Sequence, residues 1–199
     1  MLSANLKAPV TRIITPLCRG LLAAKISPNM VTSFGAFASI ASSFYFFTRG
    51  EFVTGAILNT LFTLFDLLDG TMARLSGGGT KWGAVLDSTL DRVTDGAILI
   101  SVAIYFHSKN DKLLSVVLLT LLGSFLVPYI RARAEALGIE CSVGIAERTE
   151  RLIIALLGIG LAGIGVSFAL AISMWALFIL SWITVAQRMH YVMKSQAAK

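Results

Sequence analysis

Four aspartates are grouped in the segment DLLDGTMARLSGGGTKWGAVLDSTLD, which runs from Asp66 to Asp91 and also contains Asp69 and Asp87. Residues three or four positions apart share one face of a helix, so each pair of carboxylates would project from one side of its own helix. Four carboxylates converging from two helices make a cage of oxygen ligands, which suits Mg²⁺ or Mn²⁺. Two such ions commonly serve phosphoryl transfer, because they hold the phosphate oxygens and the displaced group.

Small residues accompany the carboxylates on the same helix faces. Gly70 and Ala73 follow the first pair, and Gly83 lies one turn before the second pair. Small side chains let two backbones, or a flat ligand, approach closely. The residue types alone leave two alternatives open, since the acids could pair with Arg74 and Arg92 in a buried ionic network or form a cation-transport path.

The composition is that of an integral membrane protein. Of 199 residues, 56% are hydrophobic and only 14% are charged, and the mean hydropathy is +0.79. Soluble domains carry roughly 25% charged residues. A charge at membrane depth is costly unless it is compensated, and two divalent cations would balance the four carboxylates.

Runs with few or no charges predict six transmembrane helices, since about 20 residues span a bilayer. The predicted spans are residues 26–48, 52–75, 82–106 and 113–130, and two more from residues 152–187, divided at the glycine-rich stretch 158–167. The expected architecture is an all-α membrane protein, with a single domain over residues 1–199 and a six-helix bundle over residues 26–192.

The first 25 residues predict an amphipathic helix that precedes the bundle. Lys7, Arg12, Arg19 and Lys25 alternate with apolar residues, a pattern typical of a helix lying on an anionic membrane surface. A solvated leader is the alternative. No cleavable secretory signal is visible in this segment.

The distribution of Lys and Arg predicts the orientation. Basic residues gather in the N-terminal segment, in the second and fourth connections and in the C-terminal tail, whereas the opposite side holds only Arg49, Lys109 and Lys112. Both termini are therefore expected in the cytoplasm of a bacterial cell, and the carboxylate site is expected to open toward it. Cys18 and Cys141 match no metal-binding spacing, so free thiols are expected.

The carboxylate segment resembles, at every fixed position, the signature of the CDP-alcohol phosphatidyltransferase family, which here reads Asp66-x2-Asp69-Gly70-x2-Ala73-Arg74-x8-Gly83-x3-Asp87-x3-Asp91. The predicted helices resemble the family over the whole chain. The resemblance implies an enzyme that displaces CMP from a CDP-linked lipid with the hydroxyl of a second alcohol. It also implies a homodimer in the bacterial membrane and no nucleic-acid partner.

The resemblance also implies residue roles. Asp66 and Asp87 would bridge two Mg²⁺ ions (Mn²⁺ is possible), with Asp69 completing one site and Asp91 the other. Asp91 would also be the general base that takes the proton from the attacking hydroxyl. CDP-diacylglycerol would be held by residues of the turn SPNMVT and of the two helices: Asn29, Met30, Val31, Thr32, Gly70, Arg74 and Thr80. Asp95, outside the signature, is expected to orient Arg92 or another polar group.

Five arginines lie on the predicted cytoplasmic side, in YIRARAEALGIECSVGIAERTER and at the end of the last span. The excess of basic residues on the cytoplasmic side of a membrane protein requires only positive charge, which Lys would also supply. Arg, in contrast, can form two parallel hydrogen bonds to a phosphate. An acceptor that carries its own phosphate is therefore expected. The predicted phosphate ligands are Arg131, Arg133, Arg151 and Arg188. Arg148 is the exception, with Glu147 and Glu150 as candidate partners.

The segments RARAEALG and GIAERTER are most similar to those of family members that use an inositol phosphate. The favoured function is therefore transfer of the phosphatidyl group of CDP-diacylglycerol to an inositol phosphate, giving phosphatidylinositol phosphate and CMP. Glycerol 3-phosphate as acceptor is the alternative within the family, because the arginine cluster serves either. A divalent metal-ion transporter is the alternative of another class, and it leaves Arg74 without a role.

Overall fold

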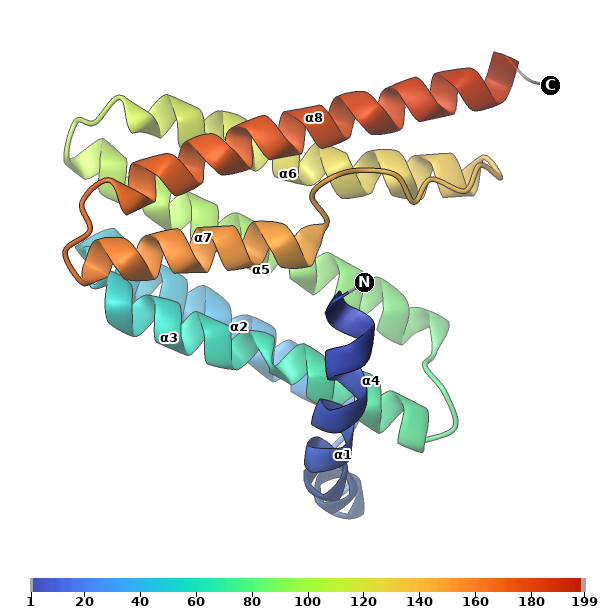
Figure 1. Ribbon diagram of the computed structural model, residues 1–199. Coiled ribbons are helices and arrows are strands. Elements are labelled where there is room, and N and C mark those ends of the chain that lie inside the picture. The colour runs from blue at the N-terminus through green and yellow to red at the C-terminus, as the bar shows by residue number, and fades with distance from the viewer. Residues whose placement is uncertain (1, 198–199) are drawn as a thin grey trace. The chain divides into compact units, whose positions relative to one another are not determined.

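The computed structural model describes residues 2–197, and the side chains of residues 13–195. Lys7, Arg12 and Lys199 are therefore outside the described side chains. All regular elements within the described residues are helical, which confirms the all-α class. In chain order they are α1 (Leu2–Ala23), α2 (Pro28–Phe46), the 3-10 turn η1 (Phe47–Arg49), α3 (Phe52–Thr63), α4 (Phe65–Leu75), α5 (Lys81–Ser108), α6 (Leu113–Ala136), α7 (Arg148–Gly163) and α8 (Ala169–Ala197) (Figure 1).

Within the described residues, four segments are long and apolar enough to cross a membrane: Pro28–Arg49, Phe52–Leu75, Leu113–Ala136 and Ala169–Ser195. The chain is thus a multi-pass membrane protein. The other two predicted spans correspond to α5 and α7, which are not in this set. α5 carries several aspartates, and α7 has 16 residues, fewer than the roughly 20 that span a bilayer. The count of six spans stays a prediction.

The chain divides into two compact units, and α2, α3 and α5 each contribute residues to both. Unit 1 comprises residues 1–42 and 58–94, and unit 2 comprises residues 43–57 and 95–199. Unit 1 therefore contains all four signature aspartates, and unit 2 contains the four arginines predicted to bind the acceptor phosphate. The single domain expected from the sequence stays a prediction.

The N-terminal helix of unit 1 packs against the helix that carries the first two aspartates. α1 and α4 are in contact, and their shared core buries Cys18, Val31 and Met72. The Cys18 thiol donates a hydrogen bond to the backbone oxygen of Leu68, over 3.6 Å. α1 is thus a helix, as predicted, and it supports α4 from one side.

A buried polar cluster joins α2 to α3 within unit 1. Ser39 Oγ donates to Asn59 Oδ1 over 2.6 Å, and Asn59 Nδ2 donates to Ser42 Oγ over 3.3 Å. Asn59 is fully buried. In an apolar surrounding such bonds hold helices together, because the separated groups would have no water to bind. They fix α2 beside the segment that leads into α4.

In unit 2, α6 and α7 both pack on α8, and Figure 1 shows α7 and α8 as consecutive helices joined by a short turn. The turn falls at residues 164–168 and Gly165 has a φ of +101°, so the predicted division of residues 152–187 is confirmed. A Cβ built on Gly158 would lie 2.1 Å from Ser173 Oγ. Only glycine therefore permits this approach of α7 to α8.

Candidate active site

Three signature carboxylates meet in unit 1. One ligand oxygen from each of Asp66, Asp69 and Asp87 lies within 4.8 Å of the other two. Asp69 is buried, and its two neighbours are half-buried. Asp66 also lies in the first turn of α4, where the positive end of the helix dipole favours a negative charge. The convergence of α4 and α5 that helical spacing predicts is observed for these three residues.

A threonine from α2 holds one of the carboxylates. Thr32 Oγ1 donates a hydrogen bond of 2.5 Å to Asp69 Oδ2, and both side chains are buried. The hydroxyl therefore restrains the orientation of Asp69. The sequence predicted only a nucleotide contact for Thr32, since nothing local links two residues that are 37 positions apart.

The fourth signature aspartate, Asp91, is not part of this group of three. Asp91 follows Asp87 by four residues on α5, which is about 6 Å along a helix axis. Its Oδ2 lies 3.5 Å from Arg92 Nη1, and its side chain is 16% exposed. Its predicted roles as metal ligand and general base stay predictions.

A cavity of about 490 Å³ adjoins the carboxylates, and its lining includes Asn29, Thr32, Asp69, Gly70, Thr80 and Asp87. Its size falls within the range of small-molecule sites, roughly 300–1,000 Å³. The signature aspartates Asp69 and Asp87 thus form part of the wall of a space that a nucleotide-sized ligand can enter.

Four of the seven residues predicted to bind the nucleotide line this cavity: Asn29, Thr32, Gly70 and Thr80. The other three are not among its lining residues, and their contact with the nucleotide stays a prediction. Val31 is buried against the α1–α4 core, and Met30 is 58% exposed. Arg74 lies in the last turn of α4, where its Nη2 donates to Thr71 Oγ1 over 2.9 Å.

The turn before α5 is organised by two of the cavity residues. The backbone nitrogen of Gly83 donates to Thr80 Oγ1 over 2.9 Å, so Thr80 caps the helix N-terminus in the usual manner of a hydroxyl residue. A Cβ built on Gly83 would lie 3.0 Å from Asn29 Oδ1 and 3.2 Å from Thr80 Oγ1. The signature glycine therefore allows Asn29 to approach α5.

The chemistry of the donor set fits a divalent cation. The cluster of Asp66, Asp69 and Asp87 offers only carboxylate oxygens, which are the ligands that Mg²⁺, Ca²⁺ and Mn²⁺ prefer. Like charges held this close disfavour one another unless a cation or a proton offsets them. The arrangement can therefore hold a divalent cation next to a ligand in the adjoining cavity.

Two of the predicted phosphate-binding arginines are buried in unit 2 and donate to backbone carbonyls of α6 and of the loop between α6 and α7. Arg188 donates from Nε to Val143 O over 2.9 Å and from Nη1 to Val127 O over 2.6 Å. Arg151 donates from Nη1 to Ala146 O over 3.1 Å. Their side chains are thus held in place by backbone carbonyls.

The remaining arginines of the cluster are more accessible. Arg131 is exposed and pairs with Glu135 over 2.8 Å, and Arg133 is also exposed. Arg148 Nε donates to Asp95 Oδ1 over 3.3 Å. Asp95 thus contacts an arginine of α7, a partner that the sequence did not predict.

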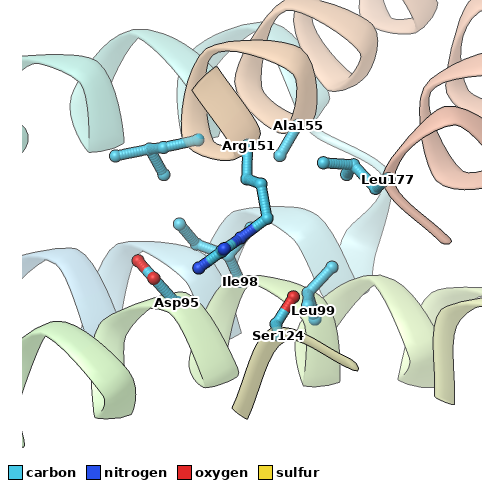
Figure 2. A pocket seen from close by; sticks show the side chains of 8 residues that line it. Asp95, Ile98, Leu99, Ser124, Arg151, Ala155 and Leu177 are labelled. Atoms are coloured by element: carbon cyan, nitrogen blue, oxygen red, sulfur yellow. The ribbon is translucent and has the colours of Figure 1, made fainter. Parts of the chain in front are cut away.

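A second, small cavity of about 20 Å³ lies in unit 2, and Asp95, Ser124 and Arg151 provide its polar lining. Figure 2 shows the Arg151 side chain extending from α7 into this space, with its guanidinium directed toward Asp95. Ile98, Leu99 and Leu177 provide apolar walls. The cavity therefore combines two charged side chains with apolar walls.

Comparison with known proteins assigns the class. The sequence model of the family described as CDP-alcohol phosphatidyltransferase matches residues 25–187, so the chain belongs to this family. It is 43% identical over 197 residues to the phosphatidylinositol phosphate synthase of Mycobacterium tuberculosis (strain ATCC 25618 / H37Rv), covering 96% of this chain and 91% of that protein.

Two solved structures are similar over nearly the whole chain. The crystal structure of Mycobacterium tuberculosis phosphatidylinositol phosphate synthase (PgsA1) with CDP-DAG bound has a TM-score of 0.87 and 44% identity, covering 91% of this chain and 94% of that chain. The structure of the same enzyme in complex with manganese and citrate has a TM-score of 0.85 and 42% identity, covering 90% and 88%.

Proposed function

We propose that this chain is a membrane phospholipid synthase that transfers the phosphatidyl group of CDP-diacylglycerol to an inositol phosphate, giving phosphatidylinositol phosphate and CMP. The observation that carries the proposal is the convergence of three signature aspartates beside a cavity of about 490 Å³. The similar proteins, which are named phosphatidylinositol phosphate synthase and include one structure with CDP-DAG bound, support the choice of substrates.

The four signature carboxylates would hold a pair of Mg²⁺ ions, with Mn²⁺ as a substitute. Asp66 and Asp87 would serve both ions, Asp69 would complete one site and Asp91 would complete the other. The manganese in a similar structure supports a divalent cation. When bound, such ions supply positive charge that offsets the pyrophosphate and the departing CMP.

The residues of unit 1 bind the donor and move the proton. Asn29, Thr32, Gly70 and Thr80 line the space proposed for the cytidine diphosphate, with Met30, Val31 and Arg74 as further contacts. A hydroxyl of the acceptor attacks the phosphorus attached to the lipid, a new P–O bond forms, and the P–O bond to CMP breaks. The hydroxyl proton passes to the Asp91 carboxylate. Positioning and electrostatics suffice for this single displacement, so no covalent enzyme intermediate is expected.

The acceptor phosphate is assigned to Arg131, Arg133, Arg151 and Arg188. The burial of Arg151 and Arg188 supports this, because carbonyl oxygens offset a buried guanidinium only in part and an anion offsets it more fully. Arginine also presents a planar fork that matches phosphate oxygens.

The proposed setting is the bacterial cell membrane. Six membrane-crossing helices follow an amphipathic surface helix formed by α1, and the active site faces the cytoplasm, as the Lys and Arg distribution indicates. The enzyme is proposed to act as a homodimer, on the strength of the family resemblance.

The proposal is tested with the purified protein in detergent, supplied with CDP-diacylglycerol and Mg²⁺. Inositol phosphate, glycerol 3-phosphate, serine and free inositol are offered in turn, and CMP release and the lipid product are measured. Inositol phosphate is expected to give the highest kcat/KM. Preferential use of glycerol 3-phosphate would refute the acceptor but not the phosphatidyl transfer, and an absence of CMP with every acceptor would refute both.

A further inference from the structure

Two arginines lie in the first turn of α7, where positive side chains are unfavourable. Arg148 is the first residue of α7 and Arg151 is the fourth. The N-terminus of a helix carries the positive end of the helix dipole, so basic side chains there are destabilised. Glu147, at the N-cap position, makes no side-chain capping hydrogen bond. The acidic residue of the turn, Glu150, is exposed.

A carboxylate from α5 faces this turn. Asp95 Oδ1 accepts the hydrogen bond from Arg148 Nε over 3.3 Å, and the two side chains are 22% and 28% exposed. A charge-assisted bond between groups shielded from water is stronger than one at the surface. Asp95 therefore ties the start of α7 to α5 within unit 2.

The same carboxylate borders the cavity that Arg151 enters. Asp95, Arg151 and Ser124 share the lining of the small cavity, and Figure 2 shows the guanidinium of Arg151 directed toward Asp95. Arg151 is 7% exposed, so its orientation depends on the few groups around it. A negative charge at Asp95 favours the observed direction and offsets the repulsion between two arginines on one helix turn.

We infer that Asp95 is a positioning residue for the acceptor: through Arg148 it anchors the first turn of α7 and thereby holds the side chain of Arg151, the arginine proposed to bind the acceptor phosphate. The inference rests on the proposed role of Arg151. Asp95 itself touches no substrate. It lies one turn beyond Asp91, so α5 carries signature aspartates of the metal site in unit 1 and, further along, a carboxylate that organises arginines in unit 2.

The test compares steady-state kinetics of Asp95→Asn, Asp95→Glu, Arg148→Gln and the double variant Asp95→Asn with Arg148→Gln. Glu150→Gln is the matched control, because it removes a carboxylate from the same helix turn at an exposed position. For each protein, the KM of inositol phosphate, the KM of CDP-diacylglycerol and kcat are measured with saturating Mg²⁺, together with the thermal unfolding midpoint in detergent.

Asp95→Asn is expected to raise the KM of inositol phosphate about tenfold, with the KM of CDP-diacylglycerol and kcat changed by less than about twofold. Arg148→Gln should reproduce this split, Asp95→Glu should restore most of the acceptor affinity, and Glu150→Gln should behave as wild type. The double variant should have about the same KM for inositol phosphate as the more affected single variant, because both substitutions break the same interaction.

Several outcomes would overturn the inference: a wild-type acceptor KM in Asp95→Asn, an equal rise of both KM values, or additive effects in the double variant. If Asp95→Asn does not fold, Arg148→Gln decides, because it breaks the same pair from the other side. An inactive wild-type protein would refute the proposed function, whereas an active wild type with an unaffected Asp95→Asn variant refutes only the role of Asp95.

Discussion

Thr32 on α2 and Asp69 on α4 are joined by a hydrogen bond of 2.5 Å from the threonine hydroxyl to the carboxylate, although 37 residues separate them. A group that restrains a metal-binding carboxylate from behind affects the affinity of the site without touching the ion. In the proposed function, the hydroxyl of Thr32 therefore supports the metal site as well as lining the cavity.

Replacing Thr32 with valine should raise the Mg²⁺ concentration needed for half-maximal activity by about tenfold or more, the usual cost of losing such a supporting contact. Thr32→Ser keeps the donor and should remain within a few-fold of wild type. Activity is measured as CMP release across a Mg²⁺ titration after chelation has removed endogenous metal. An unchanged Mg²⁺ requirement in the valine variant would show that the hydrogen bond does not support the site.

Asp91→Asn should lower kcat by about 10²–10⁴-fold, because an amide cannot accept the proton of the attacking hydroxyl. Binding of CDP-diacylglycerol, measured by calorimetry with Mg²⁺, should be retained at least in part, since Asp66, Asp69 and Asp87 form their cluster without Asp91. Asp111→Asn, an exposed change elsewhere in the chain, is the control. Near-normal CMP release by Asp91→Asn would remove this residue as the base.

Gly83→Ala should weaken the use of CDP-diacylglycerol several-fold. The added methyl group would lie 3.0 Å from Asn29 Oδ1 and 3.2 Å from Thr80 Oγ1, so it displaces two residues that line the cavity. Gly20→Ala is the matched control, because a Cβ there meets no atom within 4 Å. The KM of CDP-diacylglycerol is the readout, and equal values in the two variants would contradict the proposed donor site.

The two thiols should be unreactive in the folded protein. Cys18 and Cys141 are free and fully buried. Burial raises the pKa of the Cys18 thiol, which lowers the fraction of reactive thiolate at neutral pH. A maleimide reagent should label neither residue in detergent at pH 7 and both after denaturation, as followed by intact-protein mass spectrometry. Rapid labelling of Cys18 in the native protein would contradict the packing of α1 against α4.

Local spacing carries much of the information about the site. Asp66 and Asp69, three residues apart, share a helix face whatever surrounds them, and the short connection to α5 makes the meeting with Asp87 predictable. Hydropathy likewise predicted the four apolar spans, and a glycine-rich stretch predicted the turn between α7 and α8. These features depend on neighbouring residues along one chain segment, which a sequence displays directly.

The contacts that only the tertiary structure reveals join residues far apart in sequence. Asp95 meets Arg148 across 53 residues, and Arg188 reaches Val127 across 61. The sequence expected Glu147 or Glu150 beside Arg148, because these are its neighbours in the chain. Which polar groups meet is decided by how helices rotate and pack against one another. That choice depends on side-chain shapes along whole helix faces, so neither periodicity nor hydropathy encodes it.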